Sequence, residues 1–162
     1  MWPKGRRVAT SVLKVAYNAT GMAVQTLGPT YAGVVVGGGE GGGGVQATIH
    51  FTPSSLGGVS GRLLAVPTPG LGSPTNNASL CPFLDPPTSP PVCGWFSLLV
   101  EGAWGVRQWV NATPSIVNQS QLVLSSTVGG KVVGTQYGWS AWPVVLFTNE
   151  AGLPMVPWNC TT

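Results

Sequence analysis

Residues 95–139 read WFSLLVEGAWGVRQWVNATPSIVNQSQLVLSSTVGGKVVGTQYGW, and they predict a protein built mainly from short β-strands. The segments WFSLLVEG and GVRQWVNA are rich in β-branched and aromatic residues and have only a tight turn between them, which predicts two consecutive strands. LVLSSTV and KVVGTQYGW flank Gly129-Gly130, a pair typical of a two-residue hairpin. Short strands that recur about every ten residues are typical of an antiparallel β-sandwich.

The preceding sequence continues this pattern. Residues 31–36 (YAGVVV) and 45–52 (VQATIHFT) predict strands on either side of the glycine run 37–44, which predicts a flexible turn. That run is not a phosphate-binding loop, because it lacks the Lys-Ser/Thr pair and the strand-to-helix context. Residues 56–66 predict another short pair of strands. Residues 67–92 are rich in Pro, Ser and Asn, and predict a surface loop.

Residues 8–23 have a different period. Apolar side chains recur there at helical spacing, at Val8, Val12, Val15, Ala16, Ala19 and Ala23. Pro3 suits the first turn of such a helix, and Gly28-Pro29 is expected to end it. The helix has one apolar face, which must pack on another part of the protein.

The composition excludes several classes of function. Charged residues make up only 7% of the 162, against about 25% in an average globular chain. The 43% hydrophobic content argues against disorder, because there is apolar surface to bury. The net charge of +3 includes no basic stripe interleaved with aromatics, so nucleic-acid binding is not expected. No stretch approaches the roughly 20 apolar residues of a membrane span.

The asparagines point to the secretory route. Seven are present, and the following begin an N-x-S/T sequon: Asn18, Asn77, Asn111, Asn118 and Asn159. Ser and Thr fill 28 of 162 positions, so chance would give about one sequon. Pro114, just after the Asn111 sequon, argues against glycosylation at that site. The sequence therefore predicts a secreted or lumenal glycoprotein, and the alternative is a bias of a chain rich in Ser and Thr.

The cysteines agree with an oxidising compartment. Cys81 and Cys93 bracket the proline-stiffened loop CPFLDPPTSPPVC, which a disulfide could close with a stabilisation of about 3 kcal/mol. Cys160 is left over, either free or paired with a segment absent from this sequence. Neither the three cysteines nor the single His50 has the spacing of a metal site, and no cofactor is expected.

The first twenty residues make a poor signal peptide. Their apolar run is interrupted by Lys14 and Asn18, and no clean cleavage site follows. A chain that looks secreted without a signal peptide is expected to have lost its beginning.

Residues for acid–base or nucleophilic catalysis are scarce. All the acids are Glu40, Asp85, Glu101 and Glu150. Glu40 lies in the glycine run and Asp85 in the proline loop, where a preorganised pair is not expected. A serine triad would need His50 and Asp85, yet His50 lies in an alternating strand and no G-x-S-x-G elbow is present. These residues alone predict no active site.

The tryptophans permit a second hypothesis, a carbohydrate-binding module in which exposed indoles stack on sugar rings. Three candidates lie near the carboxyl end: Trp139, Trp142 and Trp158. Trp139 follows an alternating strand and is expected to pack in the core. Trp142 stands beside Pro143 in a loop, where a sugar contact and a packing role are equally compatible with the sequence.

Residues 136–158, QYGWSAWPVVLFTNEAGLPMVPW, resemble the carboxyl-terminal signature of the sialate O-acetylesterase family. In that family a strand V-R-Y-A-W-S leads to L-Y-N-K-E-G-L-P-A-S-P-F. Gln136, Gly138 and Trp158 replace the arginine, the alanine and the final phenylalanine. The matching residues are Tyr137, Trp139, Ser140, Leu146, Asn149, Gly152, Leu153, Pro154 and Pro157.

The amino end resembles the same family. There, H-P-R-D-K-Q begins the last helix of the catalytic domain, and G-P-x-Y follows that helix. Pro3, Lys4 and Arg6 fit the first motif, and residues 28–31 (GPTY) fit the second. The order and spacing of both motifs match, so the resemblance spans nearly the whole chain, although 37–44 and 67–92 are only loosely similar.

The resemblance implies a division of the chain and a missing active site. Residues 1–28 would be the terminal helix of a truncated α/β esterase domain of the SGNH type, and 29–162 an accessory β-sandwich. Family members are serine esterases that remove O-acetyl groups from sialic acid and other sugars. Their G-Q-S-N nucleophile motif is absent here, and Trp2 stands where the catalytic histidine is expected.

The expected function is therefore that of a carboxyl-terminal part, inactive alone, of a sialate O-acetylesterase-like carbohydrate esterase. Its partners would be acetylated sialic acid or a related carbohydrate in the parent enzyme, and the missing amino-terminal part. Without that part, residues 8–23 would expose their apolar face, and the chain alone would associate through it or be partly unfolded. The alternative is a non-catalytic secreted β-sandwich glycoprotein with a carbohydrate-binding or structural role.

Overall fold

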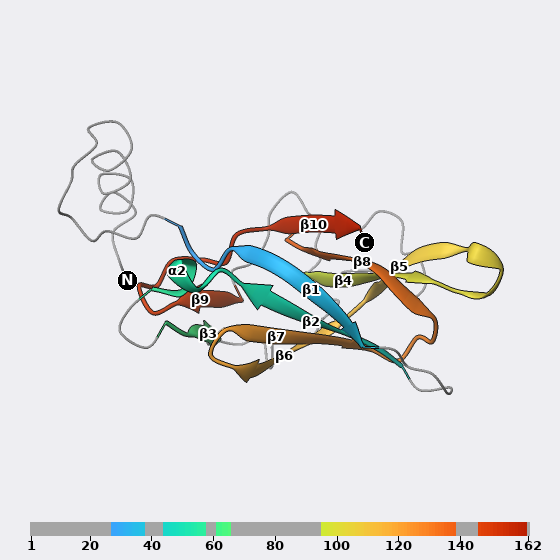
Figure 1. The fold of residues 1–162 in the computed structure, drawn as a ribbon, viewed down its shortest axis with the longest axis horizontal. Coiled ribbons are helices and arrows are strands. Elements are labelled where there is room, and N and C mark those ends of the chain that lie inside the picture. The colour runs from blue at the N-terminus through green and yellow to red at the C-terminus, as the bar shows by residue number, and fades with distance from the viewer. Residues whose placement is uncertain (1–26, 38–43, 58–60, 66–94, 139–145, 162) are drawn as a thin grey trace, which may run out of the picture.

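The computed structural model describes residues 27–37, 44–57, 61–65, 95–138 and 146–161, which form antiparallel sheets (Figure 1). The first sheet has the strand order β1-β2-β7-β6, the second has β10-β8-β4-β5, and β3 pairs with β9. The strands are β1 Tyr31–Gly37, β2 Val45–Phe51, β3 Leu63–Ala65, β4 Phe96–Glu101, β5 Arg107–Asn111, β6 Thr113–Asn118, β7 Gln121–Ser126, β8 Lys131–Tyr137, β9 Phe147–Asn149 and β10 Trp158–Thr161. The prediction of a mainly-β, antiparallel fold is confirmed.

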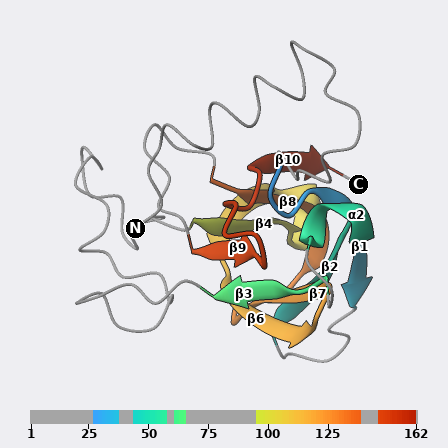
Figure 2. The same ribbon diagram turned by 90° about the vertical axis from the view of Figure 1, so that its left-hand side faces the viewer.

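The core lies between the first and the second sheet. Every second residue of β2, starting at Val45, is buried, as the pleat of a half-buried strand requires. Leu122 and Leu124 of β7 add to the same face, and Phe96 and Leu98 of β4 meet them from the second sheet. Figure 2 shows the sheets as two layers, with β10, β8 and β4 in one and β2, β7 and β6 in the other. This packing is that of a β-sandwich.

The predicted hairpin around Gly129-Gly130 is wrong. β7 pairs with β2 and β6, whereas β8 pairs with β4 and β10, so the two glycines carry the chain from the first sheet to the second. Gly130 has φ 138°, and a Cβ there would lie 2.5 Å from a methyl of Val100 and 2.8 Å from the carbonyl oxygen of Glu101. Close passage along β4 is what requires glycine at this position.

The hairpin partner of β7 is β6, a strand that the sequence analysis did not predict. Pro114 lies within β6, and proline lacks the N–H that an interior strand must donate. β6 is the edge strand of the first sheet and pairs only with β7, so the missing donor is tolerated. A proline that argues against a strand in general therefore marks an edge strand here.

The segment predicted as a pair of strands at 56–66 contains one described strand, β3. Before it, α2 (Pro53–Leu56) forms a single turn that begins with proline, a residue suited to the first helical position. β3 pairs with the distant β9.

Several expectations concern parts of the chain outside the described residues. They include the helix at 8–23, the loop at 67–92, and the disulfide between Cys81 and Cys93. Among the residues that the structure describes, no helix is long and apolar enough to cross a membrane.

Candidate functional site

The carboxyl-terminal motif forms a buried junction at one end of the sandwich. Asn149 is completely buried, and its Nδ2 donates to the carbonyl oxygens of Ser55 at 3.0 Å and of Leu27 at 3.4 Å. Its Oδ1 accepts a hydrogen bond from the backbone N–H of Leu153 at 2.9 Å. One amide side chain thus joins three segments far apart in the sequence, which is a structural role for a buried polar group.

A tight turn follows Asn149 and brings Leu153 back to its side chain. The N–H of Gly152 donates to the carbonyl of Asn149 at 2.9 Å, and Gly152 has φ 71°, the left-handed conformation that glycine adopts without strain. Beyond the turn, Pro154 forms a bridge with Thr148 of β9. The sequence NEAGLP therefore folds back on its own strand.

The amino-side motif lies directly against this turn. A Cβ at Gly28 would be only 1.8 Å from the carbonyl oxygen of Pro154, so no larger residue fits without a backbone shift. The N–H of Val156 donates to the carbonyl of Pro29 at 2.9 Å. We call residues 28–31 and 146–158 together the closing junction. The two stretches that carry the family resemblance are thus in contact with each other.

Trp158 belongs to the core and is too buried to stack on a sugar ring. Only 7% of it is exposed, and its ring stacks on Tyr31 with centroids 5.6 Å apart and meets Phe51 edge-on at 5.9 Å. Its Nε1 donates to the hydroxyl of Thr135 at 3.2 Å. This corrects the hypothesis that Trp158 is a sugar-stacking candidate, because nearly all of its ring faces other side chains. Trp139 and Trp142 lie outside the described residues.

A short chain of hydrogen bonds continues from Thr135. Its hydroxyl lies 3.3 Å from Sγ of Cys160, which in turn donates to the hydroxyl of Tyr31 at 3.1 Å. Burial, and then the neighbouring Cys160, raise the pKa of Tyr31 above its ordinary value. Cys160 forms no disulfide and is half-buried. These contacts join β1, β8 and β10, and they leave the tyrosine protonated over the ordinary pH range.

His50 has a structural partner. It lies half-buried on β2 in register with Gln121 of β7, whose Nε2 is 3.2 Å from its Nδ1. The two described carboxylates, on Glu101 and Glu150, pair with Arg107 at 2.7 Å and with Arg62 at 3.0 Å. Asp85, the proposed triad acid, lies outside the described residues. Within the described part of the chain, no group of three or more His, Cys, Asp or Glu side chains is placed to hold a metal ion.

One candidate functional site in the described part of the chain is a hollow of about 350 Å³ beside the first sheet, which has room for a ligand. Six of its lining residues carry uncharged hydrogen-bonding groups: Gln46, Asn111, Thr113, Ser125, Ser126 and Thr127. Gly44 and Val45 complete it. Hydroxyl and amide groups without a charge can bind a hydroxyl-bearing ligand such as a sugar, but they supply no acid or base for chemistry.

Three of the predicted glycosylation sites are described, and their surroundings differ. Asn159 is exposed on β10. Asn118 is exposed at the β6–β7 turn, where it hydrogen-bonds Ser120 and Gln121. Asn111 is half-buried at the hollow. Asn18 and Asn77 lie outside the described residues.

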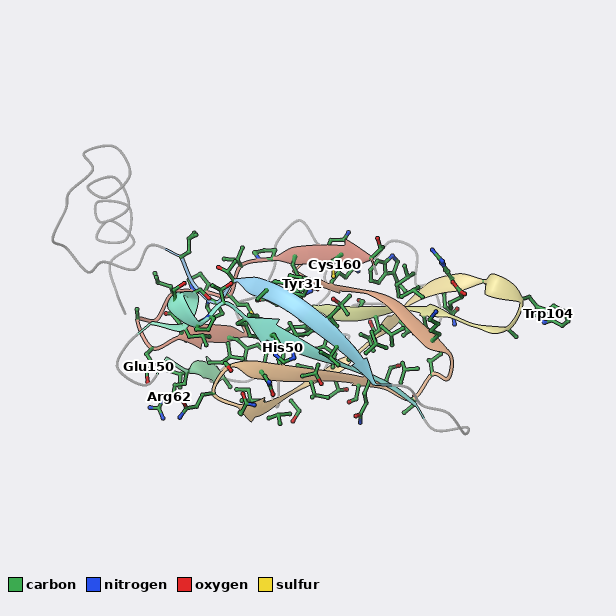
Figure 3. The ribbon with its side chains drawn as sticks, in the orientation of Figure 1. Tyr31, His50, Arg62, Trp104, Glu150 and Cys160 are labelled. Carbon is green, nitrogen blue, oxygen red and sulfur yellow. The ribbon has the colours of Figure 1, made fainter. Side chains whose placement is uncertain are left out.

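Sequence analysis missed Trp104, the most exposed aromatic residue in the described part of the chain. Trp104 is 99% exposed at the turn between β4 and β5, the only non-glycine residue of the described part with a left-handed backbone, φ 67°. Figure 3 shows it at the far end of this hairpin, away from Tyr31 and Cys160. A signal was available, because the predicted tight turn contains tryptophan between Ala103 and Gly105, where polar turn residues are usual.

No family model matches the chain, and no curated protein matches it. Among solved structures it is similar to a carbohydrate acetylesterase from Xanthomonas citri, with 21% sequence identity and a TM-score of 0.58. The likeness covers 98% of this chain and 27% of that protein. The chain therefore has the fold of part of a carbohydrate acetylesterase and spans about a quarter of that enzyme's length.

Proposed function

We propose that this chain is the accessory β-sandwich portion of a sialate O-acetylesterase-like carbohydrate esterase and is catalytically incomplete by itself. The observation that carries the proposal is the likeness to a carbohydrate acetylesterase over 98% of this chain but 27% of that protein. The parent enzyme would hydrolyse O-acetyl esters on sialic acid or a related sugar. Its serine nucleophile would lie in the larger part of the enzyme, which has no counterpart in this sequence.

The closing junction supports this assignment independently of overall fold. Residues that match the family pattern make specific contacts in this junction. Gly28 packs against Pro154, and Asn149 hydrogen-bonds three segments of the chain. A pattern that has a steric reason is harder to match by chance than one that rests on composition.

The electrostatics also support a non-catalytic portion. Both described carboxylates are neutralised by an arginine, and none of the described residues that line the hollow beside the first sheet is charged. General acid–base catalysis needs a titratable group free to exchange a proton with the substrate, and neither place offers one.

We also propose that the protein is secreted or lumenal and that Asn118 and Asn159 carry glycans. Both asparagines are exposed within the described part of the chain. Glycans would compensate for a surface with few charges, since only 7% of the residues are charged.

The test is the intact mass of the native protein after enzymatic deglycosylation, combined with peptide mapping and an acetyl-ester assay. We expect a product several hundred residues longer that contains a G-Q-S-N motif and hydrolyses acetylated sialosides, and no hydrolysis by the 162-residue chain alone. Hydrolysis by this chain that disappears in His50→Ala would refute the proposal. Each deglycosylated sequon would show an Asn-to-Asp mass change.

A second candidate function, a non-catalytic sugar-binding glycoprotein, is favoured by the hollow lined with uncharged hydroxyl and amide groups. It predicts a native product of 162 residues that binds neutral oligosaccharides and loses this binding in Ser125→Val or Gln46→Leu. Trp142→Ala tests the second possible contact, which lies outside the described residues. A long native product with esterase activity would exclude this candidate.

A further inference from the structure

The β4–β5 hairpin ends in a turn that presents one tryptophan to solvent. The N–H of Gly102 donates to the carbonyl of Val106 at 2.8 Å, and the N–H of Gly105 donates to Gly102 at 3.3 Å. Between them Trp104 is 99% exposed, and Val106 is 64% exposed. Figure 3 shows the indole projecting beyond the ribbon at the end of the molecule. We call residues 101–107 the finger.

The backbone of the finger is strained at Trp104. Its φ of 67° and ψ of 15° place it in the left-handed region, where a side chain collides with the peptide and where glycine or asparagine is the usual residue. The exposed ring gains no burial that could offset this strain. An observed outlier of this kind, in a residue that contributes nothing to the fold, suggests a function for the side chain.

The finger is held in place at its base. The Nε of Arg107 lies 2.7 Å from Oε2 of Glu101, directly across the β4–β5 pair. On the other side, β8 pairs with β4 up to Lys131 opposite Glu101. Three paired strands thus support the turn that carries Trp104. Because this support fixes the turn before a ligand arrives, little conformational entropy is lost on binding.

The same base carries an excess of positive charge. Across the three strands the register sets Lys131, Glu101 and Arg107 side by side, two cations to one anion. Arg107 keeps 58% of its side chain exposed, and Lys131 is in no ion pair with another described residue. The surroundings of Trp104 therefore favour a ligand with a negative group.

We propose that the finger is a carbohydrate-binding site in which Trp104 stacks on a pyranose ring of a carboxylate-bearing glycan. The C–H groups on one face of a pyranose match the electron-rich face of an indole, and the carboxylate would lie near Arg107 or Lys131. The choice of carbohydrate as the ligand class rests on the proposed function. The finger shares no residue with the lining of the hollow, so it would hold a sugar chain at a second place on this domain.

Other occupants fit the finger less well. Only two large apolar side chains, Trp104 and Val106, are exposed there, which gives little surface for insertion into a membrane. A stable protein interface buries about 1,200–2,000 Å², far more than a turn of five residues presents. An anionic lipid surface and a second copy of the chain are therefore outcomes that the test must separate from a glycan.

The test uses the 162-residue chain, with a galacturonic acid hexamer as the probe and a neutral cellulose hexamer as its matched control. Binding is followed by calorimetry and by NMR of the indole N–H signals. We expect binding of the acidic hexamer in the millimolar to micromolar range, weakened at least tenfold in Trp104→Ala, largely retained in Trp104→Phe, and weakened by salt. Val117→Ala, another exposed apolar residue, is expected to leave binding unchanged.

Trp104→Gly separates binding from folding, because glycine accepts the left-handed backbone: its melting temperature should be equal or higher while binding is lost. Equal binding of both hexamers would refute the contact between a ligand carboxylate and Arg107 or Lys131. No binding of either, binding to anionic vesicles, or a dimer that dissociates in Trp104→Ala would overturn it. These outcomes do not depend on the native mass or on esterase activity, which test the proposed function separately.

Discussion

The closing junction and the finger use tryptophan in opposite ways. Trp158 is 7% exposed and touches aromatic rings on several sides, whereas Trp104 is 99% exposed and touches none of them. In sequence both stand beside proline or glycine, Trp158 after Pro157 and Trp104 before Gly105. The comparison shows that the tertiary surroundings, and not the local composition, decide whether an indole is packed or exposed.

Trp158→Ala should produce the largest effect. Removing this ring leaves a cavity beside Tyr31, Phe51 and Thr135, and we expect a loss of about 3–5 kcal/mol of unfolding free energy in urea titrations. Trp104→Ala, the same substitution in the finger, should change stability by less than about 0.5 kcal/mol. Trp158→Phe, the residue in the family pattern, should lose less than Trp158→Ala. Equal losses at both positions would mean that the junction is not packed as described.

Asn149→Leu tests the polar half of the junction. Leucine is of similar size but leaves the carbonyl of Ser55 and the N–H of Leu153 buried without their partner, so we expect a loss of about 2–3 kcal/mol. Asn118→Leu removes an exposed turn amide and should change stability by less than about 1 kcal/mol. Thermal unfolding followed by near-UV circular dichroism measures both. A stable Asn149→Leu would assign the motif asparagine a role other than structural.

Alkaline pH should weaken the core and leave the finger intact. Burial raises the pKa of Tyr137 to about 12, above its ordinary value near 10, so the folded state retains the proton that the unfolded state loses. This contribution is fully present below pH 10 and disappears as the pH rises to 12. Urea titrations at intervals between pH 9 and 12 should show the fall, and Tyr137→Phe should reduce it. An unchanged slope in Tyr137→Phe would contradict the assignment.

Trp104→Gly should have a small effect, and in the stabilising direction. Relief of the left-handed strain is worth about 1 kcal/mol, seen as a higher denaturation midpoint in urea. Trp104→Ala keeps the strained backbone and is the matched control. A loss of stability in Trp104→Gly would show that the indole contributes to the fold.

The strands could be predicted from sequence wherever one face is buried. In β2 the alternation of side chains and the β-branched composition define the element, and in β4 a short apolar run does so. The partners of β7 and of β8 could not be predicted, because Gly129-Gly130 suits a hairpin between them as well as a crossing from one sheet to the other. What distinguishes the two is the close approach of Gly130 to Val100 and Glu101, a contact that exists only in the folded state.

The site residues were harder to predict, for a related reason. The sequence singles out aromatic residues, but exposure depends on what the tertiary structure leaves uncovered. Trp158 has its ring surrounded by residues from β1, β2 and β8, none of them close to it in sequence. The hollow likewise collects side chains from β2, β5, β6 and β7, and no local pattern reveals it.

The closing junction also governs the order in which the domain can assemble. Asn149 reaches back 122 residues to Leu27, and Cys160 reaches back 129 to Tyr31. Contacts between such distant positions form late, because a long loop must close before they are rewarded. During translation β1 can therefore pair with β2 early, but its contacts with Trp158 and Cys160 form only after those residues have been made, and a chain cut before residue 146 would lack the closing junction.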